Sequence, residues 1–159
     1  MGEIKLTNEY IRGLVEGEGC FTFHSVINDT VNGKKKFKIP AFIIEMHERD
    51  KNLIIALRDH LRLKNRIYRL RPVGMRMVTS QGEKIYHRGY KSRLCVRDFG
   101  QLKNVIIPMF YKRLNGNKGI QFGEWLEKIG NDPDVPTGYK LLHRLHKCGY
   151  YDKNPKFLD

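Results

Sequence analysis

The sequence has few cysteines, no long apolar run and a shortage of acidic side chains. Its 159 residues include three cysteines, Cys20, Cys95 and Cys148. Because these are odd in number and far apart, they fit neither a disulfide framework nor a zinc-ligand spacing, so reduced thiols are expected. No apolar segment approaches the ~20 residues of a bilayer span, and the amino-terminal segment lacks a signal-peptide core. We therefore expect an intracellular protein with no membrane partner.

Positive charge is what the sequence has in excess. Lys and Arg number 30 against 17 Asp and Glu, which gives a net charge of +13. Between residues 62 and 93, ten basic residues accompany one acid, Glu83. The basic residues alternate with apolar ones over residues 66–71, which places them on one face of a strand. This pattern favours a sheet that lies on nucleic-acid phosphates, although a solvated basic face would show it too.

Periodicity and capping residues predict the element order α-β-β-α-β-β-α, followed by a helical tail. This order is typical of an α+β fold in which helices pack on one face of an antiparallel sheet and leave the other face free. We expect one domain over residues 1–159, with a core at about 8–130 and a tail at about 131–159. The predicted elements are a helix at 8–16 capped by Thr7, strands at 20–27 and 36–46 around a turn at 28–34, a helix capped by Asp50, strands near 66–78 and 84–96, a short helix from Asp98 to about 105, a helix ending at Gly130, and a last helix near 138–147.

Residues 10–21, YIRGLVEGEGCF, form the most informative segment. Gly13 and Gly17 are four residues apart, so they lie on one helical face with almost no side-chain bulk, where another backbone can approach closely. Glu18 stands where the helix ends and the first strand begins. A carboxylate at that edge of the open sheet face is a candidate ligand for a divalent cation.

Residues 11–19, IRGLVEGEG, resemble the LAGLIDADG motif of the homing endonuclease family. Arg12 stands where the motif has a small residue, and both acids, Glu16 and Glu18, are glutamates. The predicted element order also agrees with the family fold, an αββαββα unit with a saddle-shaped antiparallel sheet. The resemblance therefore covers most of residues 8–130.

Two further segments are similar to family patterns. Residues 45–50, EMHERD, occupy the place of a polar residue that orients solvent, and the equivalent is Glu48 or its neighbour His47. Residues 118–125, KGIQFGEW, look like a Lys-x-x-x-Phe-x-x-Trp pattern in which the lysine faces the cleavage site. Lys118 is the preferred match for that lysine, with Lys112 or Arg113 as alternatives.

The resemblance implies a site-specific, intron-encoded endonuclease that makes a double-strand break by metal-dependent phosphodiester hydrolysis. It implies a Mg²⁺ site at Glu18 and Gly17, with Lys118 stabilising the developing charge and Glu48 or His47 orienting the attacking water. Glu16 points to a different side of the helix, and we expect it to be structural, capping a neighbouring helix end.

A chain with one motif is expected to act as a homodimer on a long, pseudo-palindromic DNA target, because two strands require two carboxylates. The dimer interface is predicted at Ile11, Gly13, Leu14 and Gly17. Strand parity counted from Glu18 predicts the DNA-contacting residues as Thr22, His24, Val26 and Asn28 on the first strand, Lys36 and Lys38 on the second, Arg69 and Arg71 on the third, and Lys91 and Arg93 on the fourth.

Two other functions fit the same resemblance. One is an RNA-splicing maturase that binds intron RNA, and the other is a non-catalytic DNA-binding protein on the same scaffold. The family resemblance leaves open whether the protein acts in a chloroplast, a mitochondrion, or a bacterial or archaeal cytoplasm.

Overall fold

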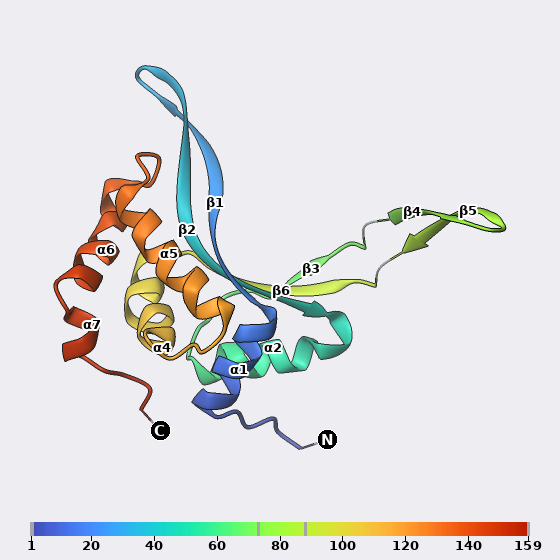
Figure 1. Ribbon diagram of the computed structural model, residues 1–159, viewed down its shortest axis with the longest axis horizontal. Coiled ribbons are helices and arrows are strands. Elements are labelled where there is room, and N and C mark those ends of the chain that lie inside the picture. The colour runs from blue at the N-terminus through green and yellow to red at the C-terminus, as the bar shows by residue number, and fades with distance from the viewer. Residues whose placement is uncertain (1, 73, 88, 159) are drawn as a thin grey trace.

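The computed structural model describes residues 2–72, 74–87 and 89–158, and Figure 1 shows a curved antiparallel sheet with helices against one side of it. The main sheet has the strand order β1-β2-β6-β3, and β4 and β5 form a separate two-stranded ribbon that extends away from it. No helix in the described ranges is long and apolar enough to cross a membrane. The strands are β1 (Gly19–Thr30), β2 (Gly33–His47), β3 (Tyr68–Leu70), β4 (Gly74–Thr79), β5 (Gly82–His87) and β6 (Lys91–Val96).

The first helix, α1 (Asn8–Glu18), runs directly into β1. Thr7 caps it as predicted, because its hydroxyl accepts a hydrogen bond from the backbone N–H of Tyr10 at 3.1 Å. The helix ends at Glu18, two residues later than predicted, and Gly19 is its C-terminal cap. A Cβ atom at Gly19 would lie 2.6 Å from Cγ1 of Val15, so the close approach of strand and helix requires glycine here.

The β1–β2 hairpin is longer than predicted and projects beyond the helices (Figure 1). The predicted seven-residue turn at 28–34 is wrong, because the strands pair continuously as far as Thr30 and Gly33. Gly33 has a φ of +104°, a left-handed conformation that permits so tight a turn. Pro40 introduces no bulge: it pairs with Phe23 in an unbroken register, at a point where β2 has only β1 beside it.

The two later strands are interrupted where continuous strands were predicted. In place of residues 66–78, the chain forms β3 and β4 on either side of Pro72, which has no N–H to donate to a sheet ladder. In place of residues 84–96, it forms β5 and β6. β4 and β5 are joined by a tight turn between Thr79 and Gly82, and Gly82 has a φ of +112°.

The helices cover one face of the sheet and continue into the tail. Asp50 precedes α2, but its side chain makes no capping hydrogen bond, so that part of the prediction is wrong. Asp98 does cap, accepting from the N–H of Gln101 at 3.0 Å. The helical elements after α1 are η1 (Glu48–Asp50), α2 (Lys51–His60), α3 (Phe99–Gln101), η2 (Leu102–Ile106), α4 (Ile107–Phe110), α5 (Asn117–Asn131), η3 (Thr137–Tyr139), α6 (Lys140–Lys147) and α7 (Tyr150–Lys153).

Aromatic side chains fill the space between the sheet and the helices. Phe21 of β1 contacts the rings of Phe42, Phe110, Phe122 and Trp125, with ring centroids 4.9–5.7 Å apart. The Trp125 indole N–H donates to a β1 backbone carbonyl at 2.8 Å, which ties α5 to the strand that follows α1. Truncating a buried aromatic residue of this kind to alanine typically costs about 3–5 kcal/mol, so this cluster fixes the sheet against α5.

The strand register assigns every sheet residue to one of two faces, because cross-strand partners share a face. Phe42 pairs with Phe21 and Val96, all buried, and these mark the face covered by helices. The opposite face, here called the open face, carries Cys20, Thr22, His24, Val26 and Asn28 of β1, Lys35, Phe37, Ile39, Ala41, Ile43, Glu45 and His47 of β2, Lys91, Arg93 and Cys95 of β6, and Tyr68 and Leu70 of β3.

Candidate active site and nucleic-acid interface

Glu18 is the last residue of α1, and its carboxylate is exposed at the junction with β1. Among the described residues, this carboxylate has no hydrogen-bond or ion-pair partner. A carboxylate that no cation neutralises is free to bind a hard cation. The structure thus places Glu18 at the junction of helix and strand, as the sequence predicts, and its role as a metal ligand stays a prediction.

The donor set in one chain is incomplete for a metal ion. No group of three His, Cys, Asp or Glu side chains within the described ranges could hold one. Gly17 adds one oxygen, because the last carbonyls of a helix have no intrahelical partner. One carboxylate and one carbonyl are hard oxygen donors of the kind that divalent cations bind, and a second chain would supply a second carboxylate.

Lys118 is the second residue of α5 and is half-buried. Its ammonium has no ion-pair partner in the part of the chain that the structure describes. By contrast, the ammonium of Lys112 lies 2.8 Å from the carboxylate of Asp152, which raises the lysine pKa above its ordinary value. Arg113 lines a shallow pocket beside Gly13. The unpaired Lys118 is therefore better placed to act on a ligand than Lys112.

Gln121 is a residue of interest that the sequence analysis did not single out. Its side-chain carbonyl oxygen is buried and, among the described residues, is the one buried side-chain polar atom without a hydrogen-bond partner. Gln121 follows Lys118 by three residues, so both lie on the same side of α5. An orphaned acceptor in a fold is commonly satisfied by bound water. The sequence places Gln121 beside Lys118 on the helix, but it does not show that the side-chain oxygen is buried.

Glu48 and His47 lie at the end of β2. The Glu48 carboxylate accepts from Nε of Arg69 at 3.0 Å, and His47 Nδ1 accepts from a backbone N–H at 3.1 Å. Gly19, the residue after Glu18, pairs with Ile44 of β2. His47 is three residues further along β2, which places its backbone about 10 Å from that pair. No contact joins either side chain to Glu18, so their role in orienting water stays a prediction.

Glu16 is structural, as expected. One of its carboxylate oxygens accepts hydrogen bonds from the backbone N–H groups of Asn115 and Gly116, the latter at 2.9 Å. Gly116 is the N-terminal cap residue of α5. The carboxylate thus caps the helix that carries Lys118.

The glycine face of α1 is uncovered. Gly13 and Gly17 are exposed, and a Cβ atom built on either would meet nothing within 4 Å. Leu14 is half-buried beside them. The predicted interface role of Ile11 is wrong: this side chain is fully buried in the core, because it lies on the opposite side of the helix.

Arg12 departs from the small residue of the motif without disturbing the glycine face. Its guanidinium turns inward and donates to the carbonyls of Met109 and Phe157, each at 2.9 Å. The arginine thus ties α1 to α4 and to the C-terminal segment.

The register tests which predicted DNA contacts share a face. Six of them, Thr22, His24, Val26, Asn28, Lys91 and Arg93, do lie on the open face. Three do not: Lys36 and Lys38 pair with Ile27 and Ser25, and Arg69 pairs with Ser92, all on the helix-covered side of the register. Lys38 is bonded to Asp132 at 3.0 Å. Arg71 is exposed but lies outside β3, so the register assigns it no face.

A sequence model of the LAGLIDADG endonuclease family matches residues 11–129 of the chain. The chain belongs to this family. The match begins within α1 and ends within α5, so it contains the glycine face, Glu18 and Lys118.

Solved structures of LAGLIDADG meganucleases share the fold. The chain is 17% identical to I-CpaMI bound to uncleaved DNA, with a TM-score of 0.58, covering 98% of this chain and 47% of that one. It is 22% identical to I-SmaMI bound to DNA, with a TM-score of 0.52, covering 89% and 44%. It is 21% identical to the homing endonuclease I-TnaI, with a TM-score of 0.53, covering 96% and 90%. No curated protein matches the chain.

The chain spans slightly less than half the length of I-CpaMI and I-SmaMI, but nearly the whole of I-TnaI. The TM-scores above 0.5 show a common fold. The residues that the family model matches, 11–129, lie within this fold.

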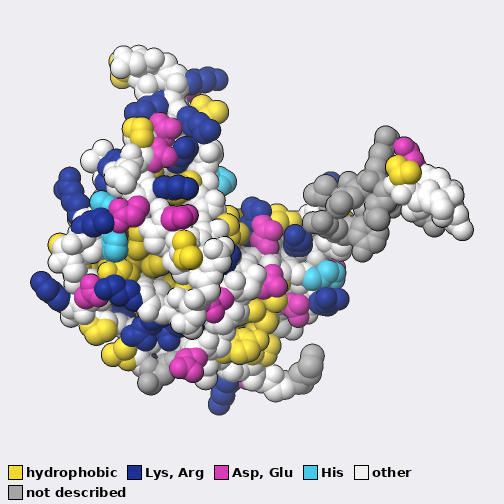
Figure 2. Space-filling model, in the orientation of Figure 1, with side chains coloured by type: hydrophobic (Ala, Val, Ile, Leu, Met, Phe, Trp, Pro, Cys, Tyr) yellow, Lys and Arg dark blue, Asp and Glu magenta, His cyan; other side chains and the backbone are white. Residues whose placement is uncertain are grey.

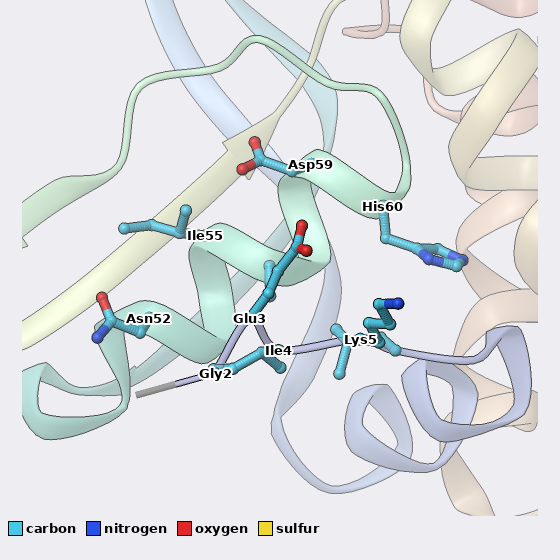
Figure 3. Close-up of a pocket in the computed structure, with 10 residues that line it drawn as sticks. Gly2, Glu3, Ile4, Lys5, Asn52, Ile55, Asp59 and His60 are labelled. Atoms are coloured by element: carbon cyan, nitrogen blue, oxygen red, sulfur yellow. The ribbon is translucent and has the colours of Figure 1, made fainter.

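One pocket lies away from the LAGLIDADG residues. It has a volume of about 700 Å³ and lies between the segment before α1 and one side of α2. Figure 3 shows Ile4, Lys5, Asn52, Ile55 and Asp59 around it. This pocket adjoins the N-terminal end of α1, whereas Glu18 lies at the other end of that helix, about 15 Å away.

Proposed function

We propose that this LAGLIDADG protein is a homodimeric, site-specific DNA endonuclease that cuts both strands of a long, pseudo-palindromic duplex. The observation that carries the proposal is the uncovered glycine face of α1, which ends at Glu18, a carboxylate without a partner among the described residues. Two such faces packed about a two-fold axis bring two carboxylates together, as two adjacent scissile bonds require.

The carboxylates of two Glu18 residues, with the carbonyls of Gly17, form an oxygen-rich site suited to a divalent cation, and specifically to Mg²⁺. When bound there, such an ion lowers the pKa of water and offsets charge on the phosphate. Lys118 stabilises the additional negative charge that develops on the phosphate oxygens, because its ammonium has no competing partner within the described ranges. Glu48 or His47 orients the attacking water.

The open face of the sheet binds the duplex. A two-stranded ribbon fits into the major groove, where base edges are distinguishable, and the β1–β2 hairpin is such a ribbon. Figure 2 shows Lys and Arg side chains along this projecting hairpin. Lys91 and Arg93 extend the positive charge across β6. The meganucleases I-CpaMI and I-SmaMI, which share the fold, were solved on DNA.

Selection of cleaved sites from a random duplex library with Mg²⁺ tests catalysis, symmetry and specificity together. We expect a recovered site with two related halves. On that site Glu18→Gln should reduce cleavage by about a hundredfold or more, because the proposed cation site loses a charged ligand and with it the stabilisation of charge in the transition state. Specific binding measured with Ca²⁺ should remain close to wild type. Glu124→Gln, which neutralises an exposed acid on α5, is the matched control and should cut normally.

The other two functions give different results in the same experiment. A protein that binds a duplex specifically yet never nicks it would be a non-catalytic DNA-binding protein. Tight binding to intron RNA without cleavage of any duplex would identify a maturase. Full cleavage by Glu18→Gln would remove this residue from the active site.

A further inference from the structure

Glu45 is the one acidic side chain on the open face of the described sheet, and it is bonded to a basic neighbour. It pairs across strands with Arg93. One carboxylate oxygen accepts a hydrogen bond from Arg93 Nε at 2.5 Å and is also in ion-pair contact with Nη2, so the carboxylate lies along one edge of the guanidinium. The other oxygen lies 3.9 Å from the ammonium of Lys91.

This arrangement is not explained by sheet stability. The Glu45 side chain is 25% exposed and that of Arg93 is 36% exposed, and ion pairs so near solvent contribute little to folding. An acid on a face that approaches DNA also repels phosphates. The presence of Glu45 on this face is therefore explained by its effect on the orientation and charge of Arg93.

A guanidinium has five N–H donors, and Glu45 lies against the edge formed by Nε and Nη2, where it accepts from Nε. The remaining donors form a planar edge on the side away from the carboxylate. In protein–DNA complexes, two donors on such an edge pair with O6 and N7 of guanine. The carboxylate also offsets the positive charge, which weakens the competing attraction of Arg93 to phosphates.

We propose that Glu45 is a positioning residue that holds Arg93 in place to read one guanine in each half-site. The inference rests on the proposed function, since it requires the open face to lie in the major groove. Glu45 would therefore lower general affinity for DNA while raising sequence specificity, two effects that a merely structural residue would not separate.

The test is binding to a random duplex library in Ca²⁺, followed by measurement of the selected site with each base changed in turn. The wild-type protein should require guanine at one symmetry-related pair of positions, and Arg93→Ala should abolish that preference. Glu45→Gln should reduce the preference about tenfold. The same variant should bind unrelated duplex at least as tightly, with the slope of log affinity against log salt steeper by about one.

Two comparisons make the test selective. Replacing the guanine by 7-deazaguanine removes the N7 acceptor, and it should weaken binding of the wild-type protein but not of Arg93→Ala. Asp132→Asn breaks the ion pair with Lys38 on the other side of the sheet, and it should leave base preference unchanged.

Unchanged guanine preference and salt slope in Glu45→Gln would overturn the positioning role while leaving the endonuclease proposal intact. A wild-type protein with no Arg93-dependent guanine position would overturn it equally. A wild-type protein that selects no duplex at all would overturn both proposals.

Discussion

Glu16 accepts a hydrogen bond from the backbone N–H of Gly116 at 2.9 Å, across 100 positions of sequence. The two residues belong to the elements that carry the site: Glu16 lies two residues before Glu18, and Gly116 lies two before Lys118. The contact also places a carboxylate at the positive end of the α5 dipole. One side chain thus fixes the relative position of the proposed metal ligand and the proposed cation.

Loss of this cap should affect catalysis more than binding. Glu16→Ala leaves two backbone N–H groups without their acceptor, and lost helix caps typically cost about 1 kcal/mol of stability. We expect a small fall in melting temperature and a larger fall in single-turnover cleavage, with affinity retained. Glu16→Gln keeps the carbonyl acceptor and should recover most of the activity. Equal loss of cleavage and binding in Glu16→Ala would contradict a role in positioning Lys118.

The glycine face of α1 gives a prediction about assembly. Gly13→Leu introduces a side chain where the protomer has open space, so the protomer should still fold. Its free energy of unfolding should rise by about 0.5–1 kcal/mol, because leucine has a higher helix propensity than glycine. The bulk should block a second α1, so sedimentation should show single protomers and double-strand cleavage should be lost. Gly19→Ala is the contrasting variant, because its Cβ meets Val15 and should destabilise the protomer itself. A dimeric, active Gly13→Leu protein would place the interface elsewhere.

Acid should weaken the contact between β2 and the segment after α5. The backbone N–H of Asp134 and then the ammonium of Lys38 hold the pKa of Asp132 below its ordinary value of 3.8. A carboxyl whose pKa is depressed by folding contributes stability above its unfolded pKa, and that contribution is lost as the pH falls through the folded pKa. Asp132→Asn should therefore show a smaller fall in melting temperature between pH 6 and pH 3 than wild type. Parallel curves for the two proteins would show that this carboxyl does not contribute.

The sequence predicts the helices and strands better than it predicts which face of the sheet each side chain lies on. Thr7 and Asp98 mark helix starts through side-chain caps that need only local chain geometry. Successive residues of one strand alternate between the two faces of the sheet, which is also a local property, and His24 lies on the open face as predicted. Parity across a turn depends on the number of turn residues, and the turn before Gly33 is shorter than predicted. For this reason Lys36 and Lys38 lie on the helix-covered side and not on the predicted open face.

Some residues of the candidate site can also be predicted from local sequence, whereas others depend on the tertiary structure. Glu18 and the glycine face follow from spacing within one helix, which the sequence displays directly. Gln121 and the Glu45–Arg93 pair depend on burial and on which strands lie side by side, and Glu45 and Arg93 are 48 positions apart. Nor did the pattern reveal that Ile11 turns into the core, since an apolar residue on a helix suits either side.

The C-terminal segment returns to the start of α1, where the carbonyl of Phe157 accepts from the side-chain amide of Asn8 at 3.2 Å. Both ends of the fold therefore emerge at the end of α1 opposite Glu18, and Figure 1 shows them on the same side of the molecule. In a pair of chains joined through α1, all four ends would lie away from the two Glu18 carboxylates. A tether between two copies would then start and end away from the open face, and the fused polypeptide would have about the length of I-SmaMI or I-CpaMI, of which this chain covers slightly less than half.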